Sequence, residues 1–368
     1  QKNVIIQPFS FSSRQRTPML VFRGFSQTAP QDTVLTIGNF DGVHVGHRAL
    51  FARLKTHAEK NGLLPAALTF EPHPREFFAL TKAPARLSTL REKLELIADE
   101  GIALTCVCHF NKQLATLSAD EFIEDILVKS LRVKHLIIGD DFHFGADRRG
   151  NFALLQAAAE RYGFQVETME SILLDGKRAS SSAVRSALAA GKMECAARLL
   201  GRPYSIDGRV IHGDKLARQL GFATANIRIK HERPPLTGVY TVEVKGVDDL
   251  TLTGVANLGF RPSANQVILP LLEVHLFNFA RNIYGTHLNV RFLHKLRDET
   301  KFPNFDALKT QIACDVAEGK AYFHHRGTEA QRKRRENQNP FAIRLIPLCS
   351  TSTLKLISKP SFLSVSLR

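Results

Sequence analysis

Residues 38–47 read Gly-Asn-Phe-Asp-Gly-Val-His-Val-Gly-His, and this stretch decides the fold of the first half of the chain. Apolar residues 34–37 precede it, and a helical pattern marked by Leu50, Leu54 and Ala58 follows it. A strand, a glycine-containing loop and a helix in this order direct backbone N–H groups and the positive end of a helix dipole toward an anion. The stretch therefore predicts a phosphate site with two histidines beside it.

Strand-like and helix-like patterns alternate from residue 34 to residue 168. The strands are predicted at Val34–Ile37, Leu64–Phe70, Ile102–His109, His135–Ile138 and Phe164–Thr168. The helices are predicted at Leu90–Glu100, Asp120–Leu131 and Phe152–Tyr162. This alternation indicates a doubly wound parallel sheet with helices on both faces. Ligands of such sheets bind beyond the carboxyl ends of the strands, which is where residues 38–47 fall.

The pattern changes near residues 201–203 to short runs with a period of two, bounded by turn residues. These runs are Tyr204–Ile211, Gly238–Val244, Leu252–Ala256, Leu271–Phe277 and Leu288–Leu293. They predict a small antiparallel β-barrel, closed off by a helix over Phe305–Glu318. We expect four segments: an N-terminal extension (1–18) without assigned structure, an α/β domain (19–195), a barrel domain with its C-terminal helix (196–320), and a basic tail without regular structure (321–368).

The formal net charge of +15 is concentrated at the two ends of the chain. Residues 1–18 carry +3 and residues 321–368 carry +7, which leaves +5 for residues 19–320. That remainder suits small polyanionic ligands, so no nucleic-acid partner is expected for the body. No apolar stretch approaches the roughly 20 residues that span a bilayer, so no membrane partner is expected either. Five cysteines without a Cys-x-x-Cys pair favour buried thiols in the cytoplasm.

Three segments of the first half carry side chains suited to nucleotide phosphates. His44 and His47 either stabilise phosphate charge or are ordinary polar loop residues. Residues 139–145 follow a predicted strand; Asp141 there could hold ribose or magnesium, or the segment is a plain loop. Residues 180–185 read Ser-Ser-Ser-Ala-Val-Arg. These serines are good helix caps, but their hydroxyls and a guanidinium also suit a polyphosphate.

The second half contains two comparable segments. Residues 212–215 read His-Gly-Asp-Lys and precede Thr224 and Asn226, whose side chains share one face of an extended strand and suit a hard cation. A β-turn rich in small residues is the alternative. Glu273 and His275 alternate with apolar residues, so they also share one face, which is either a site or simply the solvated side of the sheet.

The histidine, Ser-Ser and arginine combination resembles the nucleotidyltransferase superfamily. The longer strings at 38–47, 70–74, 139–145 and 180–185 are similar to the adenylyltransferase half of bacterial bifunctional riboflavin kinases/FAD synthetases. The strings around 212–226, Arg261-Pro262, 272–277 and 296–299 resemble the riboflavin kinase barrel of the same family. The resemblance covers roughly residues 19–320. It implies that ATP phosphorylates riboflavin to FMN in the C-terminal domain, and that ATP adenylylates FMN to FAD and pyrophosphate in the N-terminal domain.

The resemblance also implies roles for individual residues. The catalytic residues would be Glu273 as the base of the kinase, with His44 and His47 in adenylyl transfer, and Thr224 and Asn226 would hold Mg²⁺. The ATP-binding and phosphate-binding residues would be Gly38, Asn39, Phe40, Asp41, Gly42, Gly46, Asp141, Ser181, Ser182, Arg185, His212, Gly213 and Lys215. The flavin-binding residues would be Phe70, Pro72 and Phe142, with Phe144 a further candidate; each phenylalanine is as readily a core residue.

Three positions depart from the family's pattern: Ala217 replaces a glycine, Ala223 a proline, and Asn278 an acidic residue. The loss of proline removes a fixed backbone angle beside a predicted metal ligand. Two alternatives therefore stay open. One is an adenylyltransferase whose kinase barrel is inactive, and the other is a non-catalytic protein that binds flavin or nucleic acid.

The expected small-molecule partners are riboflavin, FMN and ATP with Mg²⁺, and the oligomeric state is not predicted.

Overall fold

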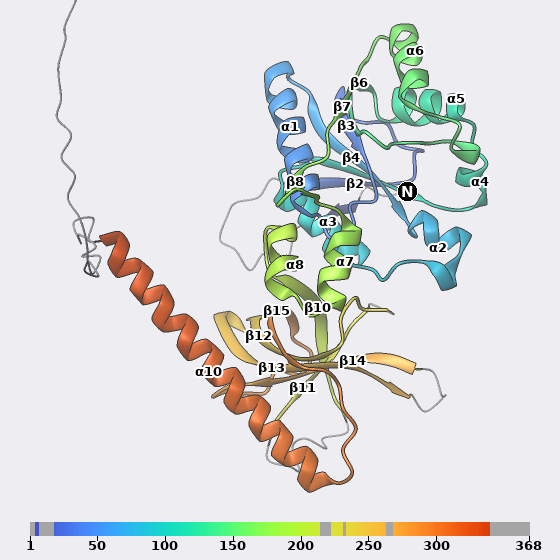
Figure 1. Cartoon of the computed structure of the whole chain (residues 1–368). Helices are drawn as coiled ribbons and strands as arrows, with labels where there is room; N and C mark the ends of the chain where they lie inside the picture. Colours follow the sequence, from blue (N-terminus) through green and yellow to red (C-terminus); the bar gives the residue numbers. More distant parts are fainter. Residues whose placement is uncertain (1–3, 7–17, 214–221, 231–232, 263–267, 339–368) are drawn as a thin grey trace, which may run out of the picture. The chain divides into compact units, whose positions relative to one another are not determined.

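A computed structural model describes residues 4–6, 18–213, 222–230, 233–262 and 268–338, and the chain divides into two compact units, Gln1–Phe323 and His324–Arg368. The first unit contains a parallel sheet followed by a closed barrel (Figure 1). The predicted α/β plus β-barrel class is thereby confirmed.

The sheet has seven strands in the order β1-β2-β5-β4-β3-β6-β7. Their bounds are β1 Val4–Ile6, β2 Met19–Arg23, β3 Thr33–Ile37, β4 Leu64–Glu71, β5 Leu104–His109, β6 Val133–Gly139 and β7 Gln165–Met169. All neighbours from β2 to β7 pair in parallel, and β1 pairs with β2 in the antiparallel direction. Each strand predicted from the sequence is present, whereas β1 and β2 were not predicted.

Helices cover both faces of this sheet. On one face, α1 (Val45–Asn61) and α3 (Leu90–Asp99) pack on the strands through Phe51, Leu54 and Ile97. On the other face lie α6 (Phe152–Tyr162) and η2 (Phe122–Ser130), a π-helical segment that continues α5 (Ala119–Glu121). Shorter elements fill the loops: α2 Pro74–Phe78, η1 Leu80–Lys82, α4 Lys112–Ala115, η3 Ala146–Arg148, and the hairpin of β8 Leu173–Leu174 and β9 Lys177–Arg178.

Two helices, α7 (Ser181–Ala189) and α8 (Met193–Leu200), connect the sheet to the barrel, and their apolar residues share one core with it. The barrel closes in the order β10-β11-β14-β13-β12-β15. Its strands are β10 Tyr204–Ile211, β11 Ala225–Arg228, β12 Gly238–Gly246, β13 Asp248–Pro262, β14 Ile268–Leu276 and β15 His287–Arg297. The sequence did not predict β11, which has only four residues.

The C-terminal helix corrects one prediction. We expected a helix over Phe305–Glu318 and an irregular tail after it, but α10 runs from Phe305 to Gln338 and includes the basic block 332–335. Residues 328–338 are rich in Gln, Arg, Lys and Glu, which have high helix propensity, and they outweigh Gly319 and Gly327 as helix breakers. Residues 339–368 lie outside the described part. None of the described helices is both long and apolar enough to cross a membrane.

Candidate active sites

The loop between β3 and α1 is held in an unusual backbone conformation. Phe40 and Val43 have positive φ angles of 47° and 40°, and Gly42 has φ 79°. A Cβ atom at Gly42 would also lie 2.8 Å from the side chain of Leu87, so only glycine fits there. Strain of this kind persists where the surrounding structure fixes it, and it is frequent at functional sites. The loop ends at His44, which is the N-cap residue of α1.

His44 and His47 lie face to face at the start of α1. Their rings stack at 3.7 Å between centroids, and the ring of Phe40 meets His47 edge-on at 5.1 Å. Burial, with a contribution from Arg178, lowers the pKa of His44 to about 4. Burial, and then the neighbouring His44, lowers the pKa of His47 well below its ordinary value. Both imidazoles are therefore neutral at pH 7 and act as hydrogen-bonding groups.

A ligand is still expected beside these rings. The Nδ1 atoms of His44 and His47 are buried, and neither has a hydrogen-bond partner in the described part of the chain. A buried ring nitrogen left without a partner costs free energy, because its hydration is lost and nothing replaces it. The pair is thus suited to a polar ligand that enters at the N-terminus of α1, where the helix dipole favours an anion.

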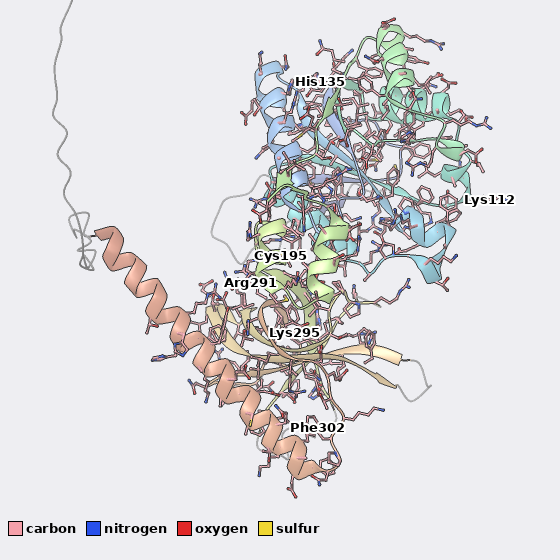
Figure 2. All side chains as sticks on the ribbon, in the orientation of Figure 1. Lys112, His135, Cys195, Arg291, Lys295 and Phe302 are labelled. Atoms are coloured by element: carbon pink, nitrogen blue, oxygen red, sulfur yellow. The ribbon has the colours of Figure 1, made fainter. Side chains whose placement is uncertain are left out.

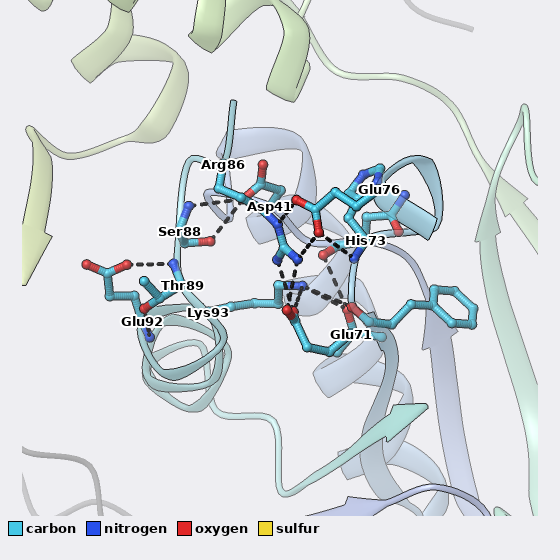
Figure 3. A network of polar contacts seen from close by, with 12 residues as sticks. Asp41, Glu71, His73, Glu76, Arg86, Ser88, Thr89, Glu92 and Lys93 are labelled. Atoms are coloured by element: carbon cyan, nitrogen blue, oxygen red, sulfur yellow. Dashed lines mark hydrogen bonds and ion pairs between the residues drawn. The ribbon is translucent and has the colours of Figure 1, made fainter. Parts of the chain in front are cut away.

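Asp41 serves mainly to hold the loop together (Figure 3). Its carboxylate accepts hydrogen bonds from the backbone N–H groups of Leu87 and Ser88 and from the Ser88 hydroxyl, at 3.0–3.1 Å. It also forms an ion pair with Arg185, whose Nε donates to Ala85 O. The side chain of Asp41 is 3% exposed, so these contacts satisfy it within the protein. Its predicted contact with phosphate stays a prediction.

The serine segment joins the same loop. Ser180 caps α7 by accepting a hydrogen bond from Ala183 N, which is the structural role that serines often have. Ser181 donates from its hydroxyl to Asp41 O at 2.9 Å, and Arg185 reaches Asp41 from one turn further along. Ser182 is exposed at the start of the helix. The structure therefore brings the segments 38–47 and 180–185 together, as their predicted common role requires.

Arg178 is a cation near this site that the sequence reasoning missed. It lies on β9, it is close enough to His44 to lower the pKa of that ring, and its Nη2 donates to Asp141 Oδ2 at 3.2 Å. Asp141 is exposed. The dipeptide Asp175-Gly176 is a strong hairpin signal, and it could have indicated that Arg178 returns toward the sheet. We call Asp41, His44, His47, Arg178 and Arg185 the sheet site.

A second polar network borders the sheet site (Figure 3). Arg86 donates to the carboxylates of Glu71 and Glu76, and the Lys93 ammonium lies 3.8 Å from Glu71. Burial alone would lower the pKa of Arg86, but its hydrogen bonds to Glu76 and Glu71 raise it. Burial lowers the pKa of Lys93, which is 1% exposed. The sequence analysis did not single out these cations.

The aromatic candidates for flavin binding differ in exposure. Phe144 is 6% exposed and packs on Phe122 in the core, which favours its structural role. Phe142 stacks on Phe144 at 5.6 Å and is half-buried, as is Phe70. Pro72 follows β4 and precedes α2. Flavin contacts at Phe70, Pro72 and Phe142 stay predictions.

Three polar side chains lie in one row across neighbouring strands of the barrel. Two of them were predicted from the sequence, and one was not. Asn226 on β11 pairs directly with Glu273 on β14, which in turn pairs with Asn257 on β13. Leu272 and Val274, on either side of Glu273, point into the barrel core, so Glu273 faces outward as the alternation predicts. Asn226 is 9% exposed, and Asn257 Oδ1 is buried without a hydrogen-bond partner among the described residues.

Neighbouring residues restrain the backbone beside this row and limit the space around its side chains. Thr224 lies two positions before Asn226, and the carbonyl of Ala223 accepts a hydrogen bond from His275 Nδ1 at 2.9 Å. A Cβ on Gly213 would come within 2.1 Å of the Asn226 amide, so the backbone at Gly213 closely approaches that side chain. His212 stacks on Tyr284 at 3.9 Å. We call Thr224, Asn226, Asn257 and Glu273 the barrel site.

Two of the predictions for the barrel fall on residues outside the described part. These are Lys215, predicted to bind phosphate, and Ala217, one of the departures from the family pattern.

Asn257 is the residue of the barrel site that the sequence analysis missed, because a lone asparagine in a long apolar strand gives little local signal. Its register opposite Glu273 is what indicates a role.

Known families match the two halves separately. A family described as FAD synthetase matches residues 26–183, and one described as riboflavin kinase matches residues 200–323. The first range covers the sheet strands from β3 to β7, and the second covers the barrel. Together they span both candidate sites, in the order along the chain that the motifs indicate.

Proteins named bifunctional riboflavin kinase/FMN adenylyltransferase match nearly the whole of both halves. The protein from Haemophilus influenzae is 50% identical over 80% of this chain and 95% of its own length, and the one from Escherichia coli K12 is 47% identical over 83% and 98%. A solved chain from Streptococcus pneumoniae, described as a macrolide-efflux protein, is 27% identical with a TM-score of 0.69 over 80% of this chain and 97% of its own. The chain therefore belongs to the family of bifunctional riboflavin kinases/FMN adenylyltransferases.

Proposed function

We propose that this enzyme of FAD biosynthesis performs its two reactions at two separate sites, adenylyl transfer at the sheet site and riboflavin phosphorylation at the barrel site. The activities follow from its family: ATP converts riboflavin to FMN, and a second ATP converts FMN to FAD and pyrophosphate. The observation that carries the division of labour is that two distinct folds of one chain each contain a polar constellation suited to one of the reactions.

At the sheet site, the FMN phosphate is already anionic and attacks the α-phosphorus of ATP without needing a base. The neutral imidazoles of His44 and His47 would donate hydrogen bonds to the charge that develops on the α-phosphate. Arg178, and Arg185 held by Asp41, would add positive charge around the polyphosphate. Fixed donors of this kind need little reorganisation when the reaction occurs, because burial and packing already hold them in place.

At the barrel site, Glu273 would accept the proton of the primary alcohol of riboflavin as its oxygen attacks the γ-phosphorus of ATP. Adenosine diphosphate then leaves, and FMN carries the transferred phosphoryl group. The hydroxyl of Thr224 and the amide oxygen of Asn226 are ligands that Mg²⁺ prefers, and the unpartnered Asn257 Oδ1 adds a third oxygen nearby. Bound Mg²⁺ supplies neutralisation of the phosphate charge.

The replacement of proline by Ala223 need not loosen this site. His275, on the same face of β14 as Glu273, contacts the carbonyl of Ala223 at 2.9 Å, which restrains the backbone that leads to Thr224. This contact supports an active kinase over the alternative of a decayed barrel. We also propose a cytoplasmic location, which fits the free thiols of Cys106, Cys108, Cys195 and Cys314. Cys106 and Cys108 are buried as expected, whereas Cys195 and Cys314 are exposed, contrary to the expectation.

The direct test is a chromatographic time course with riboflavin, ATP and Mg²⁺, resolving riboflavin, FMN and FAD. We expect FMN to appear first and FAD to follow from it. A parallel reaction that starts from FMN should give FAD without a lag. If FAD forms only from added FMN and riboflavin is never consumed, the kinase half of the proposal is wrong.

A further inference from the structure

Three potential metal ligands meet on the sheet domain, away from the sheet site. They are His57 on α1, His135 on β6 and Glu167 on β7 (Figure 2 labels His135). One ligand atom from each residue lies within 4.8 Å of the others. His57 lies ten residues after His47 on α1, which corresponds to about 15 Å along the helix. The cluster is thus near the opposite end of α1 from the phosphate loop.

The spacing fits a tetrahedral ion. Glu167 Oε1 lies 3.6 Å from His57 Nε2 and 3.5 Å from His135 Nε2. Zn²⁺ binds imidazole nitrogen and carboxylate oxygen at about 2.0–2.1 Å, so two ligand atoms on a tetrahedron lie about 3.3 Å apart. These two separations exceed that value by a few tenths of an ångström, and the ligand atoms of the two histidines lie within 4.8 Å of each other. The two imidazole rings are 4.4 Å apart between centroids and inclined by 33°, so a bound ion would have to draw their nitrogens closer together.

The orientation of His135 supports the same interpretation. Its Nδ1 atom lies 3.1 Å from Gln165 Oε1, so a proton on Nδ1 is donated to that amide oxygen and the lone pair is on Nε2. The His135 side chain is 10% exposed, and its buried Nε2 has no hydrogen-bond partner among the described residues. Metal-binding histidines usually donate their second ring N–H to an oxygen in this way.

One neighbouring group opposes a cation here. Arg53, one helical turn before His57, donates from Nε and Nη2 to the two oxygens of Glu167 at 2.9 and 3.0 Å. Its charge repels a metal ion, and it competes for Oε1. The contact with Oε2 does not block binding, because a carboxylate can ligate through one oxygen and accept a hydrogen bond on the other.

We propose that His57 Nε2, His135 Nε2 and Glu167 Oε1 form a Zn²⁺ site that joins the C-terminal part of α1 to β6 and β7. Three protein ligands leave the fourth position of a tetrahedral ion to water. The ion would tie α1, which packs on the sheet, to β6 and β7, which are hydrogen-bonded neighbours within it. This inference does not depend on the proposed function, since neither reaction uses these residues.

The test uses the full chain without a polyhistidine tag, stripped of metal and free of nucleotide, because ATP itself binds metal ions. Zn²⁺ is titrated in competition with a chromophoric chelator, and Co²⁺ is added separately to record its visible absorption. We expect one Zn²⁺ per chain and the strong absorption of four-coordinate Co²⁺. His57→Ala and His135→Gln should weaken Zn²⁺ binding at least 100-fold, and Gln165→Ala about 10–100-fold.

Arg53→Met separates a metal site from a merely structural cluster. It removes the competing cation, so it should tighten Zn²⁺ binding several-fold although it abolishes the ion pair with Glu167. The control is His324→Ala/His325→Ala, which removes two exposed histidines of α10 and should leave the stoichiometry at the site unchanged. Equal Zn²⁺ affinity in the wild type and in His57→Ala, or weaker binding in Arg53→Met, would overturn the proposal. His57 is 29% exposed, so its loss should not prevent folding.

Discussion

The side chains of the sheet site come mainly from a loop and from helices, whereas those of the barrel site lie side by side across paired strands. Asp41 contacts Ser88 and Arg185, which are 47 and 144 residues away. Asn226, Glu273 and Asn257 instead face one another through the register of β11, β14 and β13. The first site therefore depends on loops held by hydrogen bonds, and the second depends on the hydrogen-bonded ladder of a sheet.

The difference extends to electrostatics. At the sheet site, the two histidines are buried and kept neutral, and the buried Asp41 is satisfied by protein donors. At the barrel site, Asn257 Oδ1 is left without a partner in the described residues, and Glu273 is half-buried. A disturbance of the sheet site should consequently affect folding and catalysis together. A disturbance of the barrel site should affect catalysis with little effect on stability.

The sharpest test of this comparison exchanges one residue in each site. Glu273→Gln removes the proposed base, and we expect riboflavin phosphorylation to fall by about 10²–10⁴ while FMN is still converted to FAD. His47→Ala should do the reverse, with adenylyl transfer falling by about 10²–10³ and riboflavin phosphorylation preserved. Initial rates of the two half-reactions, measured separately, give both values.

A matched control is Glu194→Gln, an exposed carboxylate on α8. It should change neither rate. The division between the two sites would be wrong if Glu273→Gln lost both activities equally while its thermal unfolding matched that of the wild type.

Local sequence predicted the outline of both sites because their central motifs are continuous. The strand, loop and helix around residues 38–47 follow from apolar runs and glycines, and the outward position of Glu273 follows from a period of two. The partners of Asp41 could not be predicted in the same way. Its carboxylate was interpreted as a phosphate contact, because nothing near it in the sequence indicates that Leu87, Ser88 and Arg185 would surround it.

Two of the other features that could not be predicted from the sequence are a very short strand and a very long helix. The strand β11 has four residues, too few for a periodic pattern, and α10 continues through Gly327, which sequence reasoning takes as a helix breaker. Asn257 acquires a role only from its register opposite Glu273. The neutral state of His44 and His47 also depends on burial, which the order of residues alone does not specify.

Asp41→Ala tests whether the contacts of this carboxylate stabilise the sheet domain. The change leaves the partly buried Arg185 without its partner and removes the acceptor for Leu87 N and Ser88 N. Breaking a buried ion pair from one side costs about 3–5 kcal/mol, so we expect faster amide hydrogen exchange in α1 and loss of adenylyl transfer. Riboflavin phosphorylation should survive.

Asp147→Ala is the control for this change, because the side chain of Asp147 is 81% exposed. Unchanged exchange in α1 of the Asp41→Ala protein would contradict the structural role that we assign to this carboxylate.

Gly213→Ala tests the barrel site with a smaller change. The added Cβ would lie 2.1 Å from Asn226 Nδ2, so the amide must move away from its position opposite Glu273. Misplacement of a ligand by about 1 Å can cost 10²-fold, and we expect a loss of about 10–100-fold in riboflavin phosphorylation. Thermal stability and adenylyl transfer should be unchanged.

Gly327→Ala is the matched control, since a Cβ there meets nothing within 4 Å. A barrel that tolerates Gly213→Ala with full kinase activity would remove Asn226 from the proposed set of Mg²⁺ ligands.

The smallest expected effect is the pH dependence that His44 gives to the stability of the sheet domain. Its pKa is about 4 in the folded protein and 6.5 in an unfolded chain, so the unfolded state gains the proton first as the pH falls. The contribution of His44 to stability is therefore complete above pH 6.5 and decreases from there toward pH 4. At pH 5.5, one unit below 6.5, the loss is about 1.4 kcal/mol. Amide hydrogen exchange of α1, compared at pH 7.5 and 5.5 after correction for intrinsic rates, should show this loss.

In His44→Asn the difference in stability between the two pH values should be smaller by that amount, whereas the exposed His109→Asn should behave as the wild type. An identical pH dependence in His44→Asn and the wild type would mean that His44 is not kept neutral by burial, and the sheet site would then resemble the barrel site in its electrostatics.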